Sequence, residues 1–239
     1  MASPYKRILL KISGESLAEQ GQFGISPGEL AVIAAEIAAA KQSASFDLAV
    51  VVGGGNIIRG AKLAAAGKFD QSTADYMGML GTVINGLALK EALAAVGVES
   101  RVMSAILLPS VAESFIRPRA LRHFEKGRVV ILTAGTGNPY FTTDTCASLR
   151  AIELNADVLL KATKVDGVYT ADPRKDPGAK RYESLTFGEA VEKQLGVMDL
   201  TALTMCMEHK LPLIVFDYKV PGNITRAVRG EPIGTLVRA

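Results

Sequence analysis

The chain has 239 residues, of which 49% are hydrophobic, and carries 27 lysine and arginine residues against 24 aspartate and glutamate residues. This length allows a substantial core in one domain or two closely packed lobes, and a net charge of +3 is too small to indicate a nucleic-acid surface. With two cysteines far apart and two histidines, neither a structural zinc site nor a disulfide framework is expected.

The hydropathy pattern gives no indication of a membrane-spanning helix. No apolar run approaches the roughly 20 residues of a membrane-spanning helix, and the run near the N-terminus is too short for a secretory signal. The isolated cysteines, Cys146 and Cys206, suit a reducing compartment. We therefore expect a cytoplasmic protein without membrane or nucleic-acid partners.

Short apolar runs alternate with helical patterns along the chain. We expect strands at residues 5–12, 48–52, 98–103, 129–132, 158–161, 213–216 and 235–237, and helices at 26–42, 72–96, 117–125, 146–155, 186–194, 199–209 and 223–228. The sequence Asp166-Gly167, between apolar residues, predicts a hairpin-type turn. This order is typical of an α/β fold with a largely parallel sheet, with a soft boundary near Asp157 where the pattern restarts.

The stretch VVILTAGTGNPYFTTD, residues 129–144, joins a buried strand to a helix through a turn rich in glycine and hydroxyl groups. Residues 134–139 break helical structure and leave backbone N–H groups free. Thr142, Thr143 and Asp144 then offer N-cap oxygens for the helix. A glycine turn followed by a helix N-terminus can hold an anion, although a plain strand-to-helix loop has the same features.

Three other strand ends carry polar residues of a similar kind. Lys11 precedes a small, polar turn, three consecutive glycines at residues 53–55 precede Asn56 and Arg59, and Lys161 leads into the polar segment 162–173. Ligands of open α/β sheets gather beyond the carboxyl ends of the strands. Backbone donors, cations and carboxylates are the groups that phosphoryl transfer needs.

Other nucleotide-binding and hydrolytic classes lack their motifs here. The sequence contains no G-x-x-x-x-G-K-[ST] of a P-loop enzyme and no G-x-G-x-x-G of a dinucleotide-binding βαβ unit. It also contains no G-x-S-x-G nucleophile elbow and no protein-kinase signature. These absences argue against each of those classes.

Residues 11–14, 53–60, 75–80, 136–144 and 161–173 together resemble the bacterial uridylate (UMP) kinases of the amino acid kinase superfamily. The resemblance covers essentially the whole chain in order, and the blocks GTGNP-[YF]-FTTD and KATKVDGV-[YF]-TADP are its most specific parts. It implies a three-layer αβα sandwich with a largely parallel central sheet. It also implies one amino acid kinase domain over residues 1–239, with an acceptor half at about 1–156 and an ATP half at about 157–239.

The implied reaction is transfer of the ATP γ-phosphoryl group to UMP with Mg²⁺, giving UDP and ADP in pyrimidine nucleotide biosynthesis. Lys11 would bridge toward the transferred group, and Asp75 would accept hydrogen bonds from the ribose. The implied catalytic residues are Lys11, Arg59, Asp144 and Asp199, the last two orienting Lys11 or the metal. The implied ATP-binding residues are Lys11, Ile12, Ser13, Gly14, Gly55, Arg59, Thr163, Tyr169 and Asp172; the implied UMP-binding residues are Gly54, Asp75, Thr136, Gly137, Asn138, Pro139, Tyr140, Phe141, Thr142 and Thr143; no metal-ligating residue is singled out.

Assembly and regulation also follow from the resemblance. Enzymes of this family are typically homohexamers that GTP activates and UTP inhibits, and residues 19–25 match the region linked to GTP activation. An apolar stripe between Met77 and Leu93, which includes Leu80 and Ile84, is expected in the core or in a subunit contact.

Several of these residues also fit a structural role. Asp75 fits a first-turn helix acid, Asp172 a turn residue and Asp199 an N-cap. Lys161 and Lys164 both fit phosphate neutralisation, and nothing in the sequence chooses between them. Two rival functions remain: a kinase of this superfamily acting on a carboxylate or carbamate, and a non-catalytic oxyanion-storage protein or nucleotide sensor.

Overall fold

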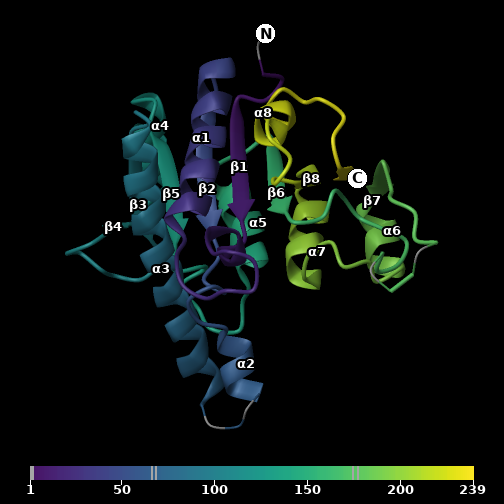
Figure 1. Cartoon of the computed structure of the whole chain (residues 1–239), viewed down its shortest axis with the longest axis horizontal. Coiled ribbons are helices and arrows are strands. Elements are labelled where there is room, and N and C mark those ends of the chain that lie inside the picture. Colours follow the sequence, from purple (N-terminus) through teal and green to yellow (C-terminus); the bar gives the residue numbers. More distant parts are fainter. Residues whose placement is uncertain (1–2, 66, 68, 174, 177) are drawn as a thin grey trace.

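The computed structural model describes residues 3–65, 67, 69–173, 175–176 and 178–239. The strands in this part of the chain form one sheet in the order β4-β3-β5-β2-β1-β6-β8-β9-β7 (Figure 1). All pairs are parallel except β8 with β9, which confirms the largely parallel sheet. The strands are β1 (Arg7–Ile12), β2 (Asp47–Val52), β3 (Ser100–Ser104), β4 (Glu113–Ser114), β5 (Val129–Thr133), β6 (Val158–Thr163), β7 (Ser184–Thr186), β8 (Leu213–Asp217) and β9 (Thr235–Arg238).

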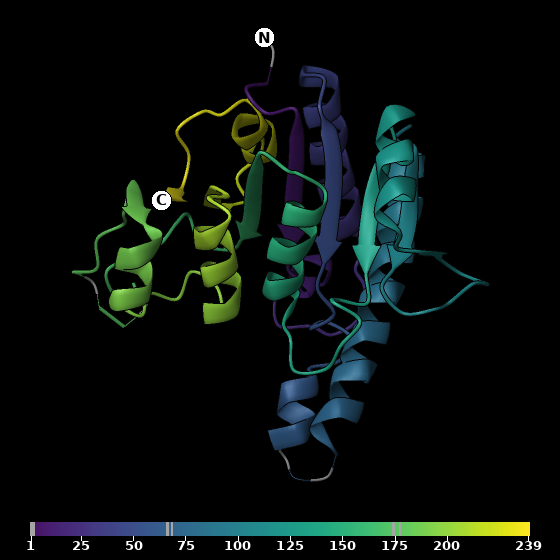
Figure 2. The ribbon, with the colours of Figure 1, turned by 180° about the vertical axis from the view of Figure 1, so that it is seen from behind.

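Helices cover both faces of the sheet. One face carries α1, α3 and α8 (Figure 1), and the other carries α4, α5, α6 and α7 (Figure 2). Because strand side chains alternate between faces, Ile8 and Leu10 pack in the first core and Leu9 in the second. The three-layer αβα sandwich is therefore confirmed. The helices are η1 (Gly14–Leu17), α1 (Pro27–Ser43), α2 (Gly60–Ala65), α3 (Gln71–Ala95), α4 (Arg117–Glu125), α5 (Thr143–Glu153), α6 (Phe187–Glu192), α7 (Leu200–Glu208) and α8 (Asn223–Val228).

Polar side chains begin the helices near the site. Ser26 accepts a hydrogen bond from the Glu29 backbone before Pro27 opens α1, as the sequence predicts. Thr142 caps α5, and Asp199 caps α7. Each cap satisfies backbone N–H groups that a helix start leaves without partners. These caps fix where α5 and α7 begin at the sheet's carboxyl edge.

The predicted hairpin at Asp166-Gly167 is wrong. The chain on either side does not pair with itself, since Tyr169 forms its antiparallel bridge with Arg181. The Val168 backbone N–H instead donates to Thr235 Oγ1 of β9 at 2.8 Å. Glycine is needed at position 167 because a Cβ there would lie 2.5 Å from that same oxygen. Packing against β9 thus overrides the local turn signal.

The start of β3 also differs from the prediction, at Ser100 and not at residue 98. Gly97 adopts a left-handed φ of +78°, and the Val98 N–H donates to Leu93 O at 2.9 Å. Residues 97 and 98 therefore close the end of α3 in the manner of a glycine C-cap. No helix in the described part of the chain is long and apolar enough to cross a membrane.

Candidate active site

Two lysines lie side by side at the carboxyl edge of the sheet and share one carboxylate. Lys11 and Lys161 are in register on the parallel strands β1 and β6, on the face that α5 covers. The ammonium of Lys11 lies 2.7 Å from Asp144 Oδ1, and that of Lys161 lies 2.7 Å from Asp144 Oδ2. None of the three side chains is more than 15% exposed. Asp144 stands in the first turn of α5, directly over the two strands.

The electrostatics of this cluster, named the lysine pair from here on, favour an anion. Burial raises the pKa of Asp144, but the ammonium groups of Lys11 and Lys161 outweigh it and hold the pKa below its usual range. Burial lowers the pKa of Lys161, and Asp144 only partly offsets this effect. Two positive charges around one negative charge leave a net positive group with little water around it. Such a group suits the negative charge of a phosphoryl group in transfer.

Glycines bring the backbone turns of the site into direct contact. A Cβ on Gly14 would lie 2.7 Å from the Gly55 nitrogen, and a Cβ on Gly53 would lie 2.6 Å from the Gly14 nitrogen. A Cβ on Gly54 would lie 2.5 Å from the carbonyl oxygen of Gly78 in α3. The turn after β1, the turn after β2 and helix α3 are therefore packed at distances that only glycine allows.

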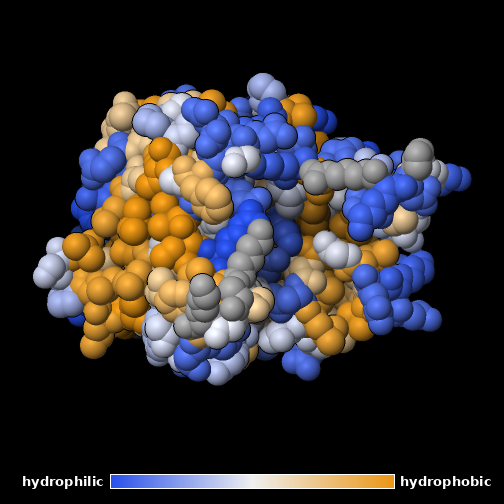
Figure 3. All heavy atoms as spheres, turned by 60° about the horizontal axis from the view of Figure 1, so that its bottom comes forward, coloured by the Kyte–Doolittle hydropathy of each residue, from blue (hydrophilic) through white to orange (hydrophobic). Residues whose placement is uncertain are grey.

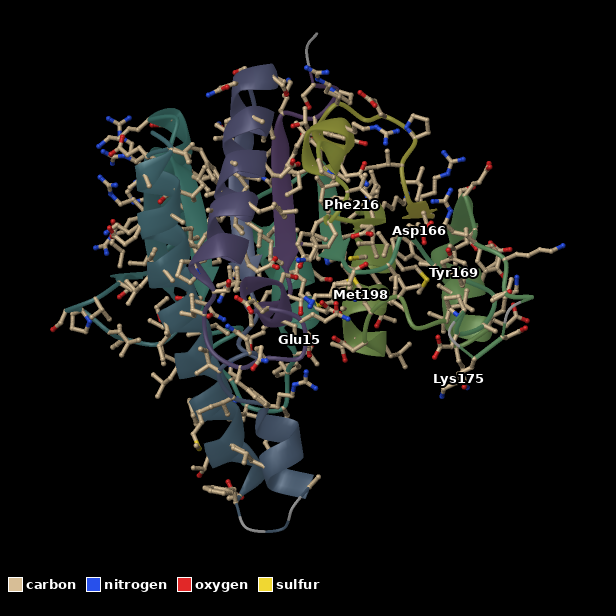
Figure 4. All side chains as sticks on the ribbon, in the orientation of Figure 1. Glu15, Asp166, Tyr169, Lys175, Met198 and Phe216 are labelled. Atoms are coloured by element: carbon tan, nitrogen blue, oxygen red, sulfur yellow. The ribbon has the colours of Figure 1, made fainter. Side chains whose placement is uncertain are left out.

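Arg59 extends this cradle but is engaged by Glu15. The Arg59 guanidinium forms an ion pair with the Glu15 carboxylate and reaches the Gly55 carbonyl at 3.4 Å. Lys164 donates to the Glu15 carbonyl at 3.1 Å, whereas Lys161 belongs to the lysine pair. The structure thus separates the two lysines that the sequence could not distinguish. Glu15, labelled in Figure 4, was missed, although it directly follows Gly14.

A cavity of about 190 Å³ lies between α3 and the loops after β2 and β5. Most of the predicted UMP-binding residues line it, whereas Gly137, Pro139 and Tyr140 complete the loop outside its lining. On the α3 wall Asp75 was predicted from the sequence, whereas Gly78 and Thr82 were missed, although both follow Asp75 at helical spacing. The lining residues are Gly54, Gly55, Ile58, Gly60, Asp75, Gly78, Met79, Thr82, Gly135, Thr136, Asn138, Phe141, Thr142 and Thr143.

The starts of α5 and α7 are joined beside this cavity. Thr142 donates to Asp199 Oδ2 at 2.5 Å, and Thr145 donates to the same carboxylate at 3.0 Å. Asp199 also accepts from the Ala202 backbone at 2.9 Å. Asp199 is thus an N-cap, which is the structural role that the sequence also allowed. Its hydrogen bonds to Thr142 and Thr145 in addition hold the start of α5, the helix that carries Asp144.

A second cavity, of about 330 Å³, lies beyond β6. Tyr169 and Asp172 line it, and Thr163 ends β6 with its hydroxyl donating to Val165 O at 2.7 Å. Tyr169 donates to Asp166 Oδ1 at 2.7 Å, and this hydrogen bond raises the pKa of Tyr169. Figure 4 shows both residues to the right of Glu15. Residues 193–196, between α6 and α7, form the other wall, and no sequence motif announces them.

In sheet order, the two cavities lie on either side of the lysine pair. The first follows β2 and β5, the second follows β6, and β1 lies between β2 and β6 in the sheet. The structure therefore gathers Lys11, Lys161 and Asp144 at the same edge of the sheet as the glycine turns, beside the linings of the two cavities. Among the described residues, no group of three or more His, Cys, Asp or Glu side chains could hold a metal ion.

Residues 6–217 match the amino acid kinase family, a span that contains the lysine pair and both cavities. The chain belongs to the amino acid kinase family. The UMP kinase from Bacillus anthracis is 41% identical to it with a TM-score of 0.93, over 98% of this chain and 96% of that one. The UMP kinase from Ureaplasma parvum is 38% identical with a TM-score of 0.91, over 98% and 99%.

The uridylate kinase from Archaeoglobus fulgidus is 30% identical with a TM-score of 0.73, over 96% of this chain and 99% of that one. These similarities place the chain with the UMP kinases of the family. The resemblance seen in the sequence and the expected phosphotransferase class are both confirmed. The roles of individual residues stay predictions.

Proposed function

We propose that the protein transfers the γ-phosphoryl group of ATP to UMP and releases ADP and UDP. The observation that carries this proposal is the lysine pair, held by one carboxylate between two cavities. UMP occupies the cavity beside α3, and the adenine nucleotide occupies the one beyond β6. The similarity to UMP kinases from two bacteria supports the choice of acceptor.

The reaction needs positioning and charge neutralisation more than acid–base chemistry. A phosphate oxygen of UMP is already anionic, so it attacks the γ-phosphorus directly, with ADP leaving in line and no covalent intermediate. Lys11 and Lys161 neutralise the charge on the transferred group. Asp144 sets the separation of the two ammonium groups, and the turns at Gly14 and Gly55 present backbone N–H groups to the phosphates.

The remaining predicted residues hold the two nucleotides. Asp75 accepts hydrogen bonds from the UMP ribose, and the loop at residues 136–143 encloses the acceptor. The Arg59 guanidinium leaves the Glu15 carboxylate and binds phosphate oxygens instead. Thr163, Tyr169 and Asp172 contact the adenine nucleotide. Lys11, Ile12, Ser13, Gly14 and Gly55 meet the phosphates of ATP, and Gly54 lies against UMP.

The substrate Mg·ATP would supply the Mg²⁺. The two carboxylates nearest the phosphate region already have cationic partners, since Asp144 contacts both lysines and Glu15 contacts Arg59. Mg²⁺ commonly keeps several waters and binds through substrate phosphates with one or two carboxylates. The donor set here therefore fits a cation that the nucleotide carries, which would neutralise charge on the β- and γ-phosphates.

Self-association also belongs to the proposal. Leu80 and Ile84 on α3 are 46% and 47% exposed, and Leu107 in the loop after β3 is 81% exposed, whereas Leu93 of the same stripe is in the core. Figure 3 shows apolar surface gathered on the left of this view, the side of α3 and β4. A large exposed apolar patch is typical of a protein interface, which supports self-association, while the number of six subunits rests on the resemblance alone.

Regulation, location and division of the chain complete the proposal. GTP activates and UTP inhibits the enzyme, which works in the cytoplasm in pyrimidine nucleotide biosynthesis. The acceptor half covers about residues 1–156 and the ATP half about 157–239, with one sheet running through both. Residues 19–25, linked to GTP activation by the resemblance, contact the site loops: Gly24 N–H donates to Asn56 O at 2.8 Å.

The test is coupled ADP release by the purified protein with Mg·ATP and one acceptor at a time: UMP, CMP, AMP, aspartate or acetylglutamate. We expect turnover with UMP far above turnover with the others. Turnover with an amino acid derivative would keep the family and overturn the substrate. Nucleotide binding without turnover on any acceptor would replace the proposal with the storage or sensor function.

A further inference from the structure

The loop between β5 and α5 is tied to α3 at both ends. The Ala134 N–H donates to Thr82 Oγ1 at 2.6 Å, and the Tyr140 N–H donates to Asp75 Oδ2 at 2.8 Å. Asp75 and Thr82 are seven residues apart, so they stand two turns apart on one face of the helix. Gly78 lies between them on the wall of the acceptor cavity. Residues 134–140 therefore cross the cavity as a strap, the name used below.

The two ties of the strap differ in their surroundings. Thr82 is 2% exposed and Ala134 is fully buried, so water cannot replace their hydrogen bond without opening the core. Tyr140 is 72% exposed, and Asp75 lies partly exposed at the cavity wall. The inner tie is thus shielded from water, whereas water can reach the outer tie between Tyr140 and Asp75.

Both tied residues have a left-handed backbone, and Ala134 at the inner tie has a φ of +61°, but only Tyr140 is a bulky, exposed residue. Its φ of +70° lies in the left-handed region, which is unfavourable for a bulky residue. The exposed side chain offers little packing to hold this conformation. The hydrogen bond to a charged carboxylate offsets the strain, so the closed strap depends on the orientation of Asp75.

Gln71 contacts the other oxygen of the same Asp75 carboxylate. It is the first residue of α3, and its Nε2 donates to Asp75 Oδ1 at 2.9 Å, an i to i+4 pair on the helix surface. With Oδ1 held by Gln71, the other oxygen of the carboxylate points at the Tyr140 N–H. Each carboxylate oxygen retains a further lone pair for a hydroxyl group of a ligand.

We propose that Gln71 is a positioning residue for the acceptor: by fixing the Asp75 carboxylate, it closes the strap over the cavity and sets the hydrogen bond to the ribose. The inference rests on the proposed function, because it takes the occupant of this cavity to be UMP. Recognition of the ribose and closure of the strap then depend on the same carboxylate. An acceptor that lacks a ribose hydroxyl therefore loses part of the ribose recognition and part of the strap's closure.

The kinetic test compares Gln71→Leu, which removes the donor, with Gln71→Lys, which restores a donor at the same spacing. Ser72→Ala is the matched control on the next residue. We expect Gln71→Leu to raise KM for UMP about fivefold to tenfold, the equivalent of about one hydrogen bond, and to reduce the preference for UMP over dUMP. We expect kcat and KM for ATP to stay within about twofold, and Gln71→Lys to recover most of the loss.

The second readout is hydrogen exchange of single backbone amides, measured without substrate. Gln71→Leu should speed exchange of the Tyr140 amide about tenfold, the equivalent of about one hydrogen bond, while the Ala134 amide, tied to Thr82, stays slow in the same molecule. Equal exchange of the Tyr140 amide in wild type and variant, or an unchanged KM for UMP, would overturn the inference. A lower melting temperature with unchanged KM and exchange would reduce Gln71 to a structural residue.

The two proposals fail in different ways. If wild-type protein does not phosphorylate UMP, the proposed function fails, while the exchange rates of Tyr140 and Ala134 still decide whether Gln71 closes the strap. If wild-type protein phosphorylates UMP and Gln71→Leu changes neither KM nor exchange, the further inference alone fails.

Discussion

Asp144→Asn is the substitution that most directly perturbs the lysine pair. It keeps the shape of the side chain and removes the charge that lies 2.7 Å from each of two ammonium groups. At an effective dielectric constant of about 20, each attraction is worth about 6 kcal/mol before desolvation. After the cost of burying the charges, removing one partner from such a cluster costs about 3–5 kcal/mol of stability. We expect kcat to fall about 10²–10³-fold, because Lys11 and Lys161 lose their common anchor.

The stability loss should depend on pH in a defined direction. The pKa of Asp144 is lowered in the folded protein, so the carboxylate stabilises the fold above the ordinary aspartate range and this contribution disappears as pH falls through the folded pKa. The pKa of Lys161, which is already lowered in the folded protein, falls further in the variant because Asp144 no longer raises it. As pH rises, Lys161 therefore loses its proton, and the cost of burying its unpaired charge disappears. The gap between wild type and variant is therefore largest near neutral pH.

Urea unfolding from pH 4 to pH 10, with kcat measured alongside, tests this reasoning. Asp47→Asn is the matched control, because Asp47 forms an ion pair of the same 2.7 Å length with Arg7 but is 30% exposed. The free energy of unfolding of the control should fall by about 1 kcal/mol, and its kcat should stay unchanged. If Asp144→Asn lost no more stability than the control at pH 7, or retained kcat, the account of the lysine pair would be refuted.

Three further predictions follow from the site. Lys11→Met should lower kcat about 10²–10³-fold with little change in KM for UMP, and steady-state kinetics showing near-full kcat would remove Lys11 from the mechanism. Gly54→Ala should lower the free energy of unfolding by about 1–3 kcal/mol and raise KM for UMP, because its Cβ would lie 2.5 Å from Gly78 O. The control in urea unfolding is Gly28→Ala, whose Cβ meets nothing closer than 3.7 Å. Burial raises the pKa of Cys146 to about 12 and that of Cys206 to about 11, so neither thiol of the folded protein should react appreciably with Ellman's reagent at pH 8; rapid reaction before unfolding would contradict their burial.

Much of the fold was predictable because its signals are local. Continuous apolar runs indicate strands covered on both faces, and Ser26 and Thr142 mark helix starts through the chemistry of their own side chains. The turn at Asp166-Gly167 was mispredicted because contacts with Thr235 of β9, far along the chain, decide its conformation. The short edge strands β4 and β7 contain too few residues to show a periodic pattern.

The roles of Asp75 on α3 and Asp144 on α5 came from the resemblance, whereas position alone points to site residues that stand at recognisable strand ends. Lys11 and the glycine turns could be found this way. The choice of Lys161 over Lys164 depends on the register of β1 against β6, a relation across 150 positions that periodicity cannot supply. Gln71 carries no motif, and its role emerges from hydrogen bonds that join α3 to the loop after β5.

The central claim is direct transfer from ATP to UMP between the two cavities, and the stereochemistry at phosphorus tests it most directly. The measurement uses ATP made chiral at the γ-phosphorus with oxygen isotopes, and determines the configuration of the β-phosphorus in the UDP formed. A single in-line displacement predicts inversion of configuration. Retention would require two displacements through a phosphorylated protein group and would contradict the account.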